Sequence, residues 1–160
     1  MSNGSEAAGL AAVFAMLLIP FIIVLIVSLF LIFVEWMIFA KGKQPGWAAL
    51  IPFYNEYIEC KMVGVNPWWI LIKYGATFIL SAIPVLNLVA VAISIYYLVL
   101  VGVSLARSFG KEDSYAVGII LLPIVFLPIL AFGSAQYKGA TPMKDVVWEK
   151  AAEIFGKKNK

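Results

Sequence analysis

The sequence predicts an all-α, polytopic membrane protein with four transmembrane helices and two interfacial amphipathic helices. Hydrophobic residues make up 63% of the 160 residues and charged residues only 13%, whereas soluble domains carry about 45–50% and about 25%. The apolar residues also gather into long uncharged runs. A helix needs about 20 such residues to cross a bilayer, and these runs are long enough. The length fits a single membrane domain, residues 1–160.

The residue inventory excludes several classes of function. The chain has no histidine, and Cys60 is its only cysteine. Histidine-ligated haem, Cys/His zinc sites, catalytic triads and an intrachain disulfide are therefore excluded. The net charge of +3 is too small for a nucleic-acid-binding protein. We expect a protein that is not an enzyme and that holds no cofactor or metal.

The first transmembrane helix is predicted at about residues 8–34. Residues 7–34 carry no charge and are rich in Leu, Ile, Val and Phe, and Pro20 favours a kink. Residues 1–6 lack the basic segment of a signal peptide, so we expect a retained anchor.

A second uncharged run, residues 74–106, is too long for one crossing and must turn. Pro84 and Asn87 favour a corner at residues 83–87. The second helix is therefore expected at 67–83, capped by Asn66, and the third at 88–108, ended by Gly110.

The fourth helix is expected at about residues 115–132, after a polar turn at 111–114. Pro123 and Pro128 weaken it. The alternative is a re-entrant hairpin broken at either proline, which membranes tolerate only where protein or water covers the backbone.

Two further segments, residues 52–63 and 142–155, place apolar and charged side chains on opposite helical faces. This pattern is typical of amphipathic helices that lie in the membrane interface.

Basic residues indicate the orientation in the cell inner membrane. Five of them flank loops 41–66 and 107–114, which we therefore expect in the cytoplasm, with both chain ends outside. A re-entrant fourth segment would instead bring the C-terminal tail, with three more lysines, to the same face. These residues are Lys41, Lys43, Lys61, Arg107 and Lys111, and in the tail Lys138, Lys144 and Lys150.

Polar residues within the apolar helices are the candidates for an intramembrane path. They are Glu35, Lys73, Thr77, Ser81, Ser94 and Tyr97. Glu35 and Lys73 could form a buried ion pair or part of an ion path, since intramembrane charge indicates function. The stronger interpretation is structural: Lys73 extends to the interface, and the hydroxyl residues serve helix packing.

Aromatic residues of the first polar loop and the helix after it are the candidate contacts with partners or lipid. They are Trp47, Tyr54, Tyr57, Trp68 and Trp69, and their rings favour the head-group level. The chain contains the motifs W-x3-IP-x-YN at residues 47–55, PWW at 67–69 and FGK at 109–111. This set resembles an uncharacterised family of small prokaryotic multi-helix membrane proteins. The resemblance, over about residues 30–140, implies the topology and a prokaryotic source but no activity.

Three functions remain open. The first is a non-catalytic accessory subunit or self-associating scaffold that contacts lipid, other membrane proteins or itself through its aromatic and amphipathic surfaces. The second is a small oligomeric channel or carrier that uses the polar stripes of the second and third helices. The third, least supported, is an enzyme acting on lipid head groups with Glu56, Glu59 or Lys61 as acid or base.

Overall fold

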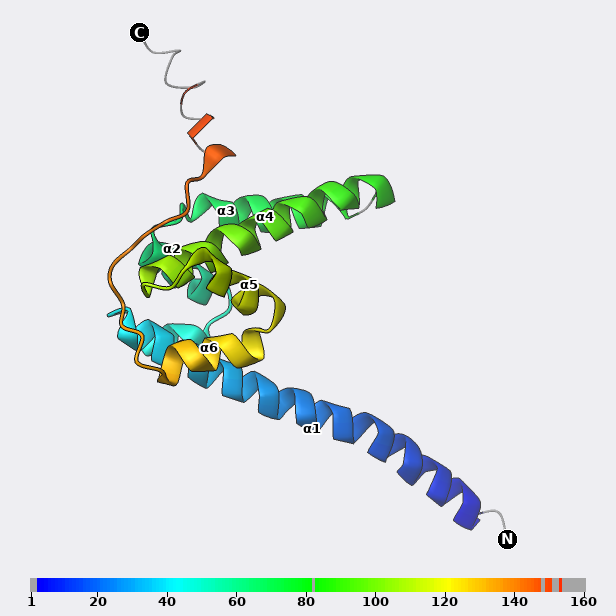
Figure 1. Ribbon diagram of the computed structural model, residues 1–160. Coiled ribbons are helices and arrows are strands. Elements are labelled where there is room, and N and C mark those ends of the chain that lie inside the picture. Colours follow the sequence, from blue (N-terminus) through cyan, green and yellow to red (C-terminus); the bar gives the residue numbers. More distant parts are fainter. Residues whose placement is uncertain (1–2, 82, 148, 151–152, 154–160) are drawn as a thin grey trace.

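All the regular secondary structure in the part that the structure describes is helical, with no strand. The structure is a computed structural model that describes residues 3–81, 83–147, 149–150 and 153. Figure 1 shows two long helical projections that leave a more compact base. In chain order the elements are α1 (Asn3–Lys41), the 3-10 helix η1 (Gly46–Leu50), α2 (Tyr54–Val63), α3 (Trp68–Leu80), α4 (Pro84–Ser108), α5 (Asp113–Leu121) and α6 (Pro123–Phe132).

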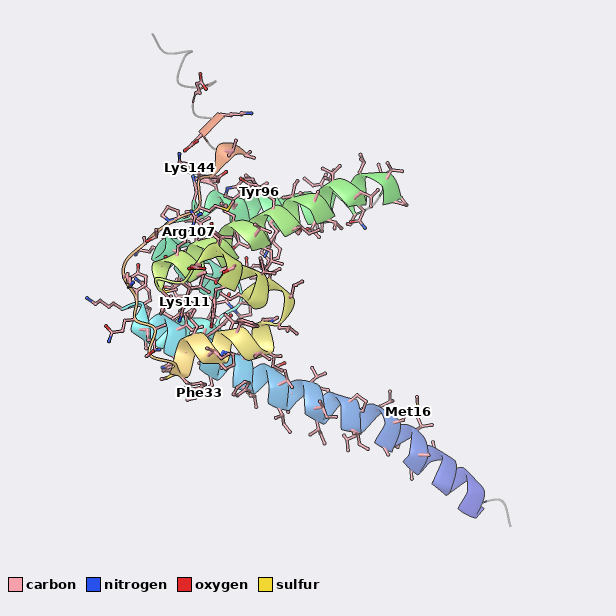
Figure 2. The ribbon with its side chains drawn as sticks, in the orientation of Figure 1. Met16, Phe33, Tyr96, Arg107, Lys111 and Lys144 are labelled. Carbon is pink, nitrogen blue, oxygen red and sulfur yellow. The ribbon has the colours of Figure 1, made fainter. Side chains whose placement is uncertain are left out.

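Helix α1 is continuous through Pro20 and extends well beyond the base. Its residues 9–30 are almost all exposed, and Met16 in Figure 2 has no other element beside it. Only its last part packs against η1 and α6, where the Phe33 and Phe132 rings lie 6.1 Å apart. The expected helix at 8–34 is therefore present and longer than predicted.

Among the described residues two helices, α1 from Gly9 to Lys41 and α4, are long and apolar enough to cross a membrane, which indicates a membrane protein. Helix α3 is apolar but shorter, and it packs along α4 as a hairpin. At its start the Trp68 amide donates to Asn66 Oδ1 at 3.0 Å, the contact expected of Asn66, although the residue directly before the helix is Pro67. Helix α4 begins at Pro84 and not at the expected residue 88, because proline fits the first helical position.

The single helix expected at residues 115–132 is wrong. The backbone breaks at Leu122 (φ −135°, ψ 58°), and α5 and α6 fold back on each other. Pro123 has no amide hydrogen to continue α5, but it fits the first turn of α6. The Tyr115 hydroxyl donates to the Phe126 carbonyl at 2.9 Å across the hairpin. This geometry is that of the re-entrant alternative.

Lys41, at the end of α1, holds the end of α6 at the base. Its ammonium donates to the carbonyl oxygens of Leu130, Gly133 and Ala135 at 2.9, 2.8 and 3.1 Å. Carbonyls at a helix C-terminus lack partners within the helix, and a cation there also suits the helix dipole. One side chain therefore joins two elements that are far apart in the sequence.

The segment after α6 runs back over the base in extended form to Asp145 (Figure 1). Two buried hydroxyls of α4 hold it: Ser108 Oγ accepts from the Thr141 amide at 3.2 Å, and Ser104 Oγ accepts from the Met143 amide at 2.9 Å. The helix expected at 142–155 begins later, because residues 141–145 continue the non-helical segment that these bonds hold against α4. Residues 146, 147, 149, 150 and 153 are helical, and residues 148, 151–152 and 154–155 of that prediction lie outside the described residues.

Helix α2 agrees with the helix expected at 52–63, but it is packed into the base. Ile58, Cys60, Met62 and Val63 are buried against the core. This core lies between α2, the last turns of α1 and α4, and the α5–α6 hairpin. The embedding of α2 brings its acidic side chains into the protein interior.

Gly110 offers a test of the local backbone. It has φ +68°, as expected for a helix-ending glycine, and an added Cβ would meet the Lys138 side chain. We expect Gly110→Ala to lower the free energy of unfolding by about 1–2 kcal/mol, the usual cost of left-handed backbone for an L-residue. Chemical unfolding in detergent measures this effect.

Gly75→Ala is the matched control. Gly75 lies inside α3, and a Cβ there meets nothing within 4 Å. This change should raise stability by about 0.5–1 kcal/mol, because alanine favours helix. Equal changes in the free energy of unfolding for Gly110→Ala and Gly75→Ala would contradict the role of Gly110 as the left-handed residue that ends α4.

Candidate functional site

A cavity of about 500 Å³ lies between α1, α2, α3, α4 and the α5–α6 hairpin. Its polar lining comes mainly from α1, α2 and α3, and its apolar lining from α4, α5, α6 and the α5–α6 break. The lining residues are Glu35, Asn55, Glu56, Glu59, Lys73, Ser94, Tyr97, Leu98, Val101, Gly102, Leu105, Ile119, Ile120, Pro123 and Leu127.

Lys73 and Glu56 form an ion pair at this cavity. The Lys73 ammonium lies 2.7 and 2.9 Å from the two Glu56 carboxylate oxygens, and the Tyr74 hydroxyl donates to Oε1 at 2.8 Å. The ammonium also lies 4.3 Å from the centre of the Tyr74 ring and 4.7 Å from that of Tyr97. Lys73 is therefore paired with Glu56 and not with Glu35, the partner considered from the sequence.

Two further carboxylates have much weaker partners. Glu35 accepts one long hydrogen bond, 3.5 Å, from the Asn55 amide group. Glu59 is partly buried, and no side chain or backbone group within the described residues donates to it. Burial, and after it the charges of Glu35 and Glu56, raise the pKa of Glu59 to about 8. Glu59 therefore holds a proton at neutral pH.

The remaining residues of the expected polar path divide into two groups. Ser94 and Tyr97 line the cavity, and the Tyr97 hydroxyl lies 3.4 Å from Cys60 Sγ. Thr77 and Ser81 do not line it. Their hydroxyls donate to carbonyls of their own helix, at Lys73 and Phe78, which is common for such residues in apolar helices.

Glu59 and Glu56 are the cavity residues that the sequence reasoning assigned elsewhere, to the polar face of an interfacial helix. Their spacing of three residues predicts one shared helical face. The missing information was which way this face points, and the packing of α2 into the base turns it toward the cavity.

The aromatic contact residues also separate. Trp47, Tyr54 and Tyr57 stack in series, with ring centres 5.4 and 6.1 Å apart, and Trp68 is 61% exposed. Trp69 is instead 4% exposed, and its indole nitrogen donates to the Asp145 carboxylate. Trp69 is therefore unavailable to a partner, because the C-terminal segment already covers it.

The arrangement suits a monovalent cation or a proton. The lining includes three carboxylates, Glu35, Glu56 and Glu59, and one ammonium, Lys73, so negative charge is in excess when all are ionised. Among the described residues no group of three or more acidic, Cys or His side chains could hold a metal ion. Ionisable groups inside an apolar helical protein typically mark sites for ions, protons or substrates.

Comparison with known proteins gives one match. A family model, described as a family of unknown function (DUF5684), matches residues 47–140. The match runs from η1 to beyond α6 and includes every cavity-lining residue except Glu35. No curated protein and no solved structure matches the chain.

The pKa of Glu59 predicts how stability depends on pH. Between pH 4.5 and about 8 the folded chain holds a proton on Glu59 that the unfolded chain releases. The Glu59 contribution to the free energy of unfolding therefore becomes less favourable as pH rises through this interval. Glu59→Gln cannot ionise, so we expect its thermal midpoint in detergent to fall less than that of the wild type across the same interval.

Glu149→Gln is the control, because Glu149 is exposed and does not line the cavity. Its midpoint should follow the wild type at each pH. If the thermal midpoints of the wild type and Glu59→Gln fell in parallel as pH rises, the pKa of Glu59 would not be raised.

Proposed function

Because the chain belongs to this family of unknown function, we propose from the geometry alone that it is a multi-pass membrane protein that carries a small monovalent cation, as a channel or carrier. The observation behind this proposal is the cavity lined by Glu35, Glu56 and Glu59, where Lys73 is the one lining cation among the described residues. We propose a non-catalytic role, because the carboxylates of the lining offer recognition of a positive charge.

The proposed topology places α1 and α4 across the cell inner membrane. Helix α3 then makes a short crossing beside α4, and the α5–α6 hairpin is re-entrant in place of a fourth crossing. Inside a membrane, a broken helix is tolerated only where other parts of the protein cover it or where it lines a cavity. Residues of α5 and α6, including Pro123, line this cavity. Loops 41–66 and 107–114 and the C-terminal tail would share the cytoplasmic side, because their lysines and arginine then lie together.

A flux measurement tests the proposal. Proteoliposomes should take up labelled K⁺, Na⁺ or phenethylammonium faster than protein-free vesicles do, at constant pH and ionic strength. We expect Glu59→Gln to reduce the signal by about tenfold or more, because the carboxylate stabilises a cation in apolar surroundings.

Glu149→Gln should behave as the wild type, because it lies outside the cavity. Signals from all three cations that equal those of protein-free vesicles would contradict a transport function.

A second function, accessory subunit or self-associating scaffold, is favoured by a different observation. Residues 9–30 of α1 expose an apolar surface that no described element covers. In a bilayer this surface contacts lipid, a second copy or another membrane protein. We propose this assembly role alongside transport, since one copy of so few helices encloses a path poorly.

Cross-linking tests the assembly role. Single cysteines at Met16 or Leu25 on the exposed part of α1 should cross-link in native membranes, whereas one at the buried Leu100 should not. Cysteine at Leu100 is the matched control for nonspecific reaction. A lone monomer in mild detergent, with no cross-linked neighbour in membranes, would contradict this role.

A further inference from the structure

The two sides of the cavity differ in chemistry. Carboxylates of α1 and α2 form one side, and aliphatic side chains of α4, α5 and α6 form the other, among them Leu98, Val101, Ile119 and Leu127. We propose that the cavity binds an organic ammonium ion with an apolar body. This inference rests on the proposed function and names the class of its ligand.

Lys73 shows how this cavity holds a primary ammonium. Its Nζ meets both oxygens of one carboxylate, Glu56, and lies over two tyrosine rings at 4.3 and 4.7 Å. Carboxylates and the faces of aromatic rings are the groups that bind alkylammonium ions. The lysine stem is apolar, so the side chain itself is an organic ammonium seated in the proposed manner.

The charge balance leaves room for a second ammonium. Lys73 neutralises Glu56, whereas Glu35 has one long hydrogen bond and Glu59 has none within the described residues. An uncompensated carboxylate in apolar surroundings takes up a proton or a cation. Binding of the ammonium would release the Glu59 proton to water, so that one positive charge replaces another.

The groups facing Glu59 from the packed elements support this exchange. They are Glu35 on α1, Glu56 on its own helix, and Lys73 on α3, with Tyr97 of α4 near Cys60. Helices α5 and α6 contribute apolar lining only: Ile119, Ile120, Pro123 and Leu127. The ammonium head would therefore lie toward α2 and the apolar body toward the α5–α6 hairpin.

An inorganic cation fits this lining less well. Dehydrated metal ions need several oxygen ligands around one point, and no such group of three occurs in the described part of the chain. The aliphatic side chains of α5 and α6 supply no oxygen ligand, but they offer apolar surface to a ligand. A cavity of about 500 Å³ is also within the usual range of sites for small organic ligands, about 300–1,000 Å³.

Titration calorimetry of the full chain in detergent tests the inference, with phenethylammonium as the probe. The neutral isostere 2-phenylethanol tests whether binding needs the positive charge, and methylammonium tests whether it needs the apolar body. We expect each to bind at least about tenfold more weakly than phenethylammonium, because each lacks one of the two interactions. Glu59→Gln should weaken phenethylammonium binding about tenfold or more, and Glu149→Gln should leave it unchanged.

Three results would overturn the inference: equal binding of 2-phenylethanol, equal binding of methylammonium, or displacement of phenethylammonium by equimolar Na⁺ or K⁺. Folding of Glu59→Gln is checked by its thermal midpoint. The proposed transport function and the proposed ligand class can be contradicted independently of each other. Uptake of K⁺ or Na⁺ without binding of phenethylammonium leaves the transport function and removes the ligand class, whereas binding without uptake removes transport and leaves the binding site.

Discussion

The ion pair between Glu56 and Lys73 is the interaction on which the site depends. Helix α2 carries carboxylates into a protein whose helices are otherwise almost entirely apolar, and an unpaired charge there is unfavourable. Lys73 supplies the counter-charge from α3, and its contact with the Tyr97 ring extends the connection to α4. Both side chains keep some exposure, 17% and 22%, so the pair avoids the full desolvation cost of a buried one.

The α5–α6 hairpin makes the cavity possible. A continuous helix through residues 113–132 would fill or bypass the space, but the break at Leu122 lets α5 pack against α4 and α6 turn back to pack against α1. Close approach requires small residues: a Cβ at Gly102 would lie 3.2 Å from Ile120, and one at Gly118 would overlap Phe126. The Lys41 ammonium then satisfies the carbonyls at the far end of α6.

The C-terminal segment closes the base over α2, α3 and α4. The Tyr137 hydroxyl donates to the Met62 carbonyl at 2.7 Å, and Asp145 accepts from Trp69 and, at 3.0 Å, from Tyr96. The hydroxyls of Ser104 and Ser108 serve the same segment and not a path through the protein. The small and polar stripe of α4 is therefore divided between two tasks, with Ser94 and Tyr97 at the cavity and the two buried serines at the base.

The sequence by itself determined the features that depend on near neighbours. Apolar runs indicated α1 and α4, the cap at Asn66 and the left-handed Gly110 followed from local backbone chemistry, and Pro123 marked the place where a helix could break. Only the tertiary structure decided between a crossing helix and a hairpin, because this depends on Lys41, about 90 residues away. It also decided that Lys73 pairs with Glu56 and not with Glu35. A helical period tells which side chains share a face, but the direction of that face is set by packing between distant segments.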